Sequence, residues 1–103
     1  MMVRDIAHTR AGDKGDTLNV AVICYRAEDY PLLRERLTVA RVRKAFAGIA
    51  KGTVRRYELP GHAALNFVIE GALGGGVSRT LSTDPHGKSF SALVAGIDLG
   101  QPA

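Results

Sequence analysis

Apolar and polar positions follow a strand-like pattern through Leu18–Tyr25, the most apolar run in the N-terminal half of the chain. The even positions of this run are all apolar, and its odd positions mix polar and apolar residues, beginning with Asn19 and Ala21. Apolar residues on both sides of a strand predict a central strand that is covered on at least one face. Similar patterns predict further strands at Val3–His8, Thr53–Leu59, Ala64–Glu70 and Val77–Thr83.

Helical spacing appears in the segments between these strands. Asp29-Tyr30-Pro31 is typical of a helix start with proline in the first turn, and Thr38 is the predicted cap of the next helix. That second helix is predicted to end at Gly52 and to carry an apolar stripe of Val39, Val42, Phe46 and Ile49. Ser89–Ile97 is predicted to be an amphipathic helix, with a strand as the alternative.

This order of strands, helix, strands and helix predicts an α+β fold. The expected architecture is a ferredoxin-like two-layer sandwich, with a mainly antiparallel sheet and the helices on one face. The chain has 103 residues, enough for one core, so we expect a single domain over residues 1–103.

The segment Arg10–Thr17, which reads RAGDKGDT, is the densest polar feature of the chain. Its first seven residues hold four charges and two glycines, and we interpret it as a loop. The glycines would let backbone N–H groups converge on an anion. Arg10 and Lys14 either pair with neighbouring aspartates in a structural turn or donate hydrogen bonds to a bound carboxylate. The sequence leaves both readings open.

Two isolated residues also suggest a site. Arg79 falls on the apolar side of its predicted strand, where an unpaired charge is very costly, so it needs a loop aspartate or a bound anion. Asn66 points away from the apolar side of its own strand, toward a ligand or a polar edge. The predicted ligand-binding residues are Arg10, Gly12, Asp13, Lys14, Gly15, Asp16, Asn66, Arg79, Asp84 and Lys88.

Other chemistries find little support. The turn before Gly87-Lys88-Ser89 lacks the first glycine of a phosphate-binding loop, because Ser82 stands at that position. The three histidines are scattered, so we predict no metal site and no cofactor. Ser82, Asp84 and His86 could be drawn as a triad, but their spacing has no specificity, and the catalytic residues stay unassigned.

Charge and composition narrow the class of protein. The net charge is +4, and many basic residues fall between Arg34 and Arg56. Without tryptophan or an accompanying aromatic pattern, we interpret this cluster as a solvated helix face, not a nucleic-acid site. No run approaches the roughly 18 apolar residues of a membrane span, and no signal peptide is evident. Cys24 is the only cysteine, which fits a reducing cytoplasm and a place in the core.

Four motifs occur in a fixed order along the chain: R-x-G-D-K-G-D, L-N-F, G-G-V-x-R and D-x-x-G-K, at Arg10–Asp16, Leu65–Phe67, Gly75–Arg79 and Asp84–Lys88. Through them, residues from Val3 to Leu99 resemble the small ferredoxin-fold domain at the C-terminus of acyclic terpene utilisation (AtuA-like) proteins. That domain also occurs as a separate short chain. The resemblance implies the fold and a link to terpene catabolism through CoA esters. It implies no catalytic activity for this domain.

Two functional hypotheses follow. The first is a non-catalytic ligand-binding or assembly component of acyl-CoA or terpenoid catabolism. Such a component would be homo-oligomeric, would work with a larger enzyme and would bind an anionic small molecule. The alternative is a small enzyme or enzyme subunit that acts on a carboxylate or a CoA ester through the RAGDKGD segment, with Asp13, Lys14, Asp16 and Arg79 in the site.

Overall fold

The structure, a computed structural model, describes residues 1–14, 17–47, 52–71 and 88–100. These ranges contain four strands, four α-helices and two short 3-10 helices. The helices are α1 (Val3–Ile6), α2 (Tyr30–Arg36), α3 (Val39–Ala45) and α5 (Lys88–Ala95), with short 3-10 helices at Ala27–Asp29 and Pro60–His62. The strands are β1 (Ala7–Lys14), β2 (Thr17–Cys24), β3 (Val54–Leu59) and β4 (Ala64–Ile69).

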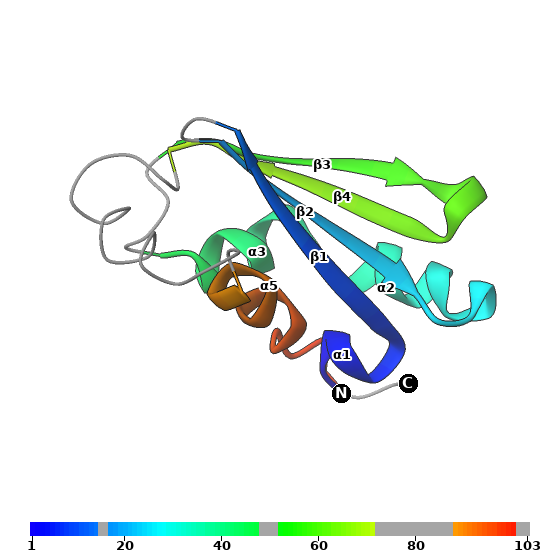
Figure 1. Cartoon of the computed structure of the whole chain (residues 1–103). Coiled ribbons are helices and arrows are strands. Elements are labelled where there is room, and N and C mark those ends of the chain that lie inside the picture. The colour runs from blue at the N-terminus through cyan, green and yellow to red at the C-terminus, as the bar shows by residue number, and fades with distance from the viewer. Residues whose placement is uncertain (15–16, 48–51, 72–87, 101–103) are drawn as a thin grey trace.

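All four strands join one antiparallel sheet in the order β1-β2-β4-β3. The helices lie together on one side of this sheet (Figure 1). The result is the predicted two-layer α+β sandwich, and β2 takes the central place that its apolar pattern predicts. No helix in the described ranges is long and apolar enough to cross a membrane.

The core fills the space between the sheet and the helices. Alternate residues of β2 and β4 are fully buried, and residues from α2, α3 and α5 pack against them. The rings of Phe46 and Phe90 stack with their centroids 5.9 Å apart, which joins the end of α3 to α5. The buried residues at this interface include Leu18, Val20, Val22, Leu33, Val42, Leu65, Phe67, Ile69 and Val94.

Helix α5 is fastened to the sheet at its β1 edge. The hydroxyl of Thr9 lies 2.6 Å from the Ser91 hydroxyl and donates to the Ser91 carbonyl, while Ser91 Oγ donates to the Thr9 carbonyl. This reciprocal pair satisfies polar groups that would otherwise be costly beside the core.

Arg56 joins the opposite edge of the sheet to the end of α2. Its Nη1 donates to the carbonyls of Arg34 and Leu37 at 2.6 and 2.9 Å, and its Nη2 lies 3.1 Å from Glu58 Oε2. The last carbonyls of a helix have no partner within the helix, so a guanidinium in this position caps them. One arginine of the basic cluster is therefore a structural tether.

The two ends of the described chain lie side by side. The N–H of Val3 donates to the Ile97 carbonyl at 3.0 Å, and the N–H of Leu99 donates to the Met1 carbonyl at 2.7 Å. Asp98 accepts a hydrogen bond from the N–H of Gly100 and lies 3.5 Å from the Met1 amino group. Both interactions lower the pKa of Asp98, and the hydrogen bond from the Gly100 N–H has the larger effect.

Several predicted elements are confirmed, and two are wrong. Thr38 caps α3 by accepting from the N–H of Arg41, and the C-terminal segment is the helix α5. Val3–His8 is not one strand, because Asp5 accepts from the N–H of Met2 and closes a helical turn before β1 begins. Helix α3 ends at Ala45, well before Gly52. The predicted strand at Val77–Thr83 lies outside the described residues.

Arg56→Met is expected to lower the free energy of unfolding by about 1–3 kcal/mol, because it removes hydrogen bonds from a charged donor to helix-end carbonyls. Arg55→Met is the matched control, since Arg55 is exposed on the same strand and should change stability by less than about 0.5 kcal/mol. Urea unfolding of both variants in dilute solution measures the difference. Equal losses would contradict the capping role.

Asp98→Asn is expected to make the stability of the fold less dependent on pH in the acid range. The lowered pKa of Asp98 contributes stability above the unfolded-state value of about 3.9, and this is lost as the pH falls through the folded-state value. The urea midpoint of the wild type should therefore fall more steeply on acidification below about pH 5 than that of the variant. Parallel profiles would show that Asp98 contributes nothing through its charge.

Candidate functional site

The RAGDKGDT segment is not a loop over most of its length, which corrects the sequence interpretation. Arg10–Lys14 belong to β1, and each residue pairs with β2, down to Lys14 opposite Thr17. This pairing satisfies the backbone groups and outweighs the poor strand propensity of glycine and aspartate. Gly12 sits in strand backbone and is not among the glycines with positive φ. The candidate residues Arg10–Lys14 therefore belong to a strand of the sheet and not to a loop.

The sheet has one face that no described element covers (Figure 1). Its register places Arg10, Ala21, Asn66 and Tyr57 in one row across all four strands. A second row contains Gly12, Asn19, Val68 and Arg55. We call these two rows the open face.

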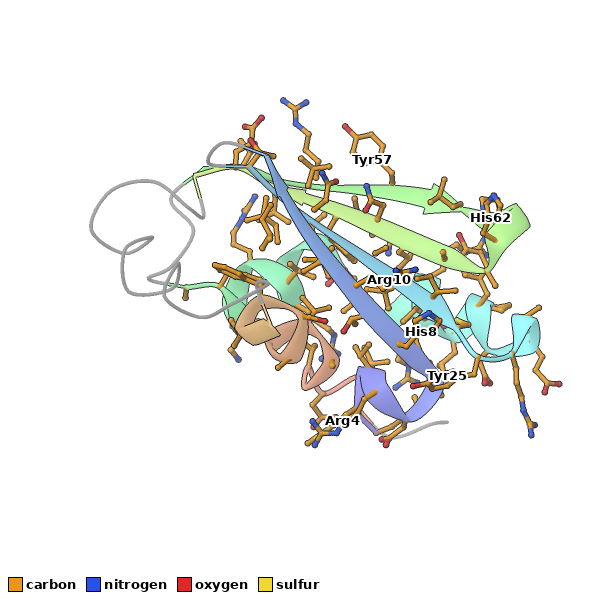
Figure 2. The ribbon with its side chains drawn as sticks, viewed as in Figure 1. Arg4, His8, Arg10, Tyr25, Tyr57 and His62 are labelled. Carbon is orange, nitrogen blue, oxygen red and sulfur yellow. The ribbon has the colours of Figure 1, made fainter. Side chains whose placement is uncertain are left out.

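Arg10 is exposed on the open face, and within the described part of the chain it makes no hydrogen bond or ion pair (Figure 2). Neighbouring strands lie about 4.8 Å apart, so the backbones of Arg10 and Asn66 are about 10 Å from one another. Only Ala21 lies between them in this row. A guanidinium can reach across such a small residue. No heavy atom lies within 4 Å of the place a Cβ would take at Gly12, so there is free space beside Arg10.

Asn66 lies on the open face, as the sequence predicts. Its neighbours Leu65 and Phe67 are fully buried on the other side, whereas Asn66 is half-buried. The Asn66 amide donates to Asn19 Oδ1 at 3.2 Å, which orients both amides across β2 and β4. These two amides add hydrogen-bond donors and acceptors next to Arg10.

The charge of the open face is positive in its described residues. Arg10 and Arg55 are its charged side chains, and both are exposed. The next acid along β4, Glu70, accepts a hydrogen bond from Thr53 Oγ1 at 2.7 Å. An anion that reaches this face meets two cations and no described acid within either row.

Aromatic side chains border the same surface. Tyr57 is 48% exposed at the β3 end of its row. His8 and Tyr25 stack with ring centroids 5.6 Å apart, toward the end of β1 at which the strand begins (Figure 2). The sequence pattern assigns no site role to Asn19, Tyr57 or Arg55. Only the register of three strand pairings shows that they share a face with Arg10.

The structure thus brings together Arg10, Gly12 and Asn66 from the predicted set. Only the backbone is described at Asp13, Lys14 and Lys88, and Lys88 begins α5 in the helix layer. Four predicted residues lie outside the described ranges, and their convergence with Arg10 stays a prediction: Gly15, Asp16, Arg79 and Asp84.

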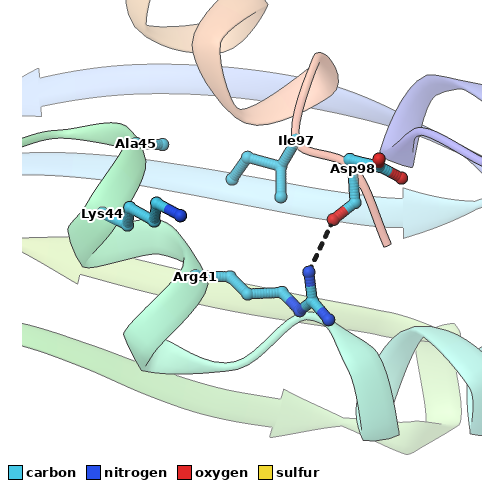
Figure 3. Close-up of a pocket in the computed structure, with 5 residues that line it drawn as sticks. All are labelled: Arg41, Lys44, Ala45, Ile97 and Asp98. Carbon is cyan, nitrogen blue, oxygen red and sulfur yellow. Dashed lines mark hydrogen bonds between the residues drawn. The ribbon is translucent and has the colours of Figure 1, made fainter. Parts of the chain in front are cut away.

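A pocket of about 500 Å³ lies on the opposite, helical side (Figure 3). Its lining consists of Arg41, Lys44, Ala45, Ile97 and Asp98. Arg41 Nη1 already donates to the backbone carbonyl of Asp98 at 2.8 Å, and the Asp98 carboxylate balances part of the positive charge. None of the predicted ligand-binding residues within the described ranges is among these lining residues.

Metal and thiol chemistry gain no support from the described residues. They contain no group of three or more metal-ligating side chains. Cys24 is buried in the core, as predicted, and burial followed by the charge of Asp29 raises the pKa of its thiol. A thiol that resists ionisation is a poor nucleophile. The Ser82, Asp84 and His86 combination lies outside the described ranges.

Comparison with known proteins agrees with the architecture. No curated protein and no solved structure matches the chain. One family model does match, over residues 1–99, and its description is the AtuA ferredoxin-like domain. The match includes all four ordered motifs and every strand of the described sheet. The chain therefore belongs to the AtuA ferredoxin-like domain family, and its antiparallel sheet with packed helices has the ferredoxin-like fold.

Proposed function

We propose that this protein is a non-catalytic binding module whose open face takes a carboxylate-bearing small molecule, with Arg10 as the principal donor. The observation that carries the proposal is the position of Arg10. It is an exposed cation with no described partner, set in a row with Ala21 and Asn66.

The chemistry of the row suits a carboxylate. A guanidinium presents two parallel N–H donors that match the two oxygens of a carboxylate. The paired amides of Asn19 and Asn66 offer further hydrogen bonds on one side, and Arg55 adds positive charge in the next row. The small residues Gly12 and Ala21 let the anion approach the backbone closely.

The groups around Arg10 favour binding over catalysis. General acid–base catalysis needs a side chain that exchanges a proton near the working pH. The described polar side chains in the two rows of the open face are amides, guanidinium groups and the Tyr57 phenol, and all of these are hydrogen-bonding groups. His8 is the residue type that transfers protons most often, and here its ring stacks on Tyr25 one row away from Arg10.

Family membership supports the biological setting of this proposal. The AtuA resemblance links the domain to acyl-CoA or terpenoid catabolism, in which carboxylates and their CoA esters are the metabolites. The domain would then hold or present such a molecule beside a larger enzyme of the same process. The alternative is a small enzyme that acts on a CoA ester. Turnover of such an ester by the isolated chain would distinguish this enzyme from the binding module.

Arg10→Gln is expected to weaken carboxylate binding by about tenfold or more, the loss that follows when one charge-assisted hydrogen-bond pair is removed. The measurement is an NMR chemical-shift titration of the isolated chain with 3-methylbutanoate, its CoA ester and inorganic phosphate. Shifts should concentrate in β1, β2 and β4. Arg43→Gln is the matched control, because Arg43 is exposed on α3 in the other layer.

Two results would overturn the proposal. One is the absence of saturable shifts in the wild type with all three probes. The other is hydrolysis of the CoA ester by the isolated chain that is lost in His8→Gln, which would establish the enzyme instead. A response to phosphate that matches the response to the carboxylate would show that the face selects charge without selecting the carboxylate.

A further inference from the structure

Strand β3 forms an edge of the sheet with no described strand on its outer side (Figure 1). An edge strand presents unpaired backbone N–H and C=O groups, which makes it a template for another strand. The other edge, β1, is held to α5 by the Thr9–Ser91 hydrogen bonds. Strand β3 also carries two exposed large apolar side chains, Tyr57 at 48% and Leu59 at 41%.

We infer that two copies of this chain associate by antiparallel pairing of their β3 strands, centred on Tyr57. Four strands from each copy would then form one continuous sheet. The inference concerns the edge of the sheet, and it does not depend on what the open face binds.

The sequence of β3 is complementary to itself in this register. With Tyr57 on the two-fold axis, Arg56 of each copy stands opposite Glu58 of the other, and Arg55 stands opposite Leu59. Opposite charges across a strand pair stabilise it, and like charges destabilise it. Paired residues also share a face of the sheet, so both open faces point to the same side.

Neighbouring symmetric registers place like charges on the axis. A pair centred on Arg55 or Arg56 opposes two arginines, and a pair centred on Glu58 opposes two carboxylates. The Glu58 register also sets Pro60, which lacks an N–H, opposite Arg56. Tyr57 is therefore the centre that the charges of β3 select.

The charged groups at this edge are already ordered in the single chain. Arg56 is anchored to the carbonyls of Arg34 and Leu37, and its Nη2 holds Glu58 at 3.1 Å. Pairing would add the second copy's Arg56 to a carboxylate that is still 45% exposed. Because these side chains are held in place beforehand, association immobilises little further.

A second copy fits the edge better than it fits the open face. Two open faces packed against one another would bring Arg10 and Arg55 of each copy together, with no described acid in either row. The edge instead offers the opposite charges of Arg56 and Glu58 on either side of Tyr57, together with two apolar side chains. The charge pattern thus assigns self-association to β3 and leaves the open face to an anion.

The test uses single cysteines in a Cys24→Ala background. Tyr57→Cys should give a disulfide-linked dimer on mild oxidation, because residue 57 faces itself across the axis and directly opposed Cβ atoms lie within about 5.5 Å. Arg55→Cys should cross-link poorly, since it faces Leu59. Tyr25→Cys is the matched control, because Tyr25 is an exposed tyrosine directly after β2, away from the β3 edge, and this variant should stay monomeric.

Sedimentation of the unmodified chain gives the second measurement. At high micromolar concentration its mass should be twice the 11.0 kDa of one chain. Glu58→Arg should raise the dissociation constant about tenfold or more, because it replaces both opposite-charge pairs with like charges. Its circular dichroism should match the wild type, and Arg10→Gln should leave the mass unchanged.

A mass of 11.0 kDa at high concentration would overturn the inference and would leave β3 as an edge for a strand of another protein. A dimer that cross-links through residue 55 or 25 but not through 57 would place the interface elsewhere. A dimer whose affinity is unaffected by Glu58→Arg would rule out the proposed register.

Discussion

Strand β2 pairs with β1 on one side and with β4 on the other, and this double pairing decides the face of every side chain in the centre of the sheet. Side chains alternate along a strand, so a slip of one residue would exchange the two faces. The slip would expose Val20 and Val22, which are now fully buried, and would bury Asn19. Burial of the apolar positions therefore holds the register, and the register places the polar residues together on the open face.

The arginines show how the same side chain takes different roles in the two layers. On the helical side, Arg41 and Arg56 donate to backbone carbonyls and tie segments that are distant in sequence. On the open face, Arg10 and Arg55 extend from the sheet without a described partner. Positive charge along the sequence predicts neither role, because the role depends on which acceptors the fold brings near.

The binding surface and the assembly surface that we propose occupy different parts of this sheet. The open face is a surface of side chains, and its chemistry comes from a guanidinium, two amides and small residues. The β3 edge is a surface of backbone groups, flanked by Arg56 and Glu58. An anion bound at Arg10 would stay accessible in a pair of chains joined at β3.

The sequence by itself determined the strands with strong apolar patterns, the start of α2 and the Thr38 cap, because burial and capping act over a few residues. For the C-terminal segment it favoured a helix and left a strand as the alternative, and only the tertiary structure shows the helix α5 packed beside β1. The sequence also placed Asn66 opposite Leu65 and Phe67. It could not show that Arg10–Lys14 form a strand, because that depends on hydrogen bonds to β2. Nor could it align Tyr57 with Arg10, since that row requires three strand pairings between residues far apart in sequence. Long-range pairing, which no local pattern encodes, decided the candidate site.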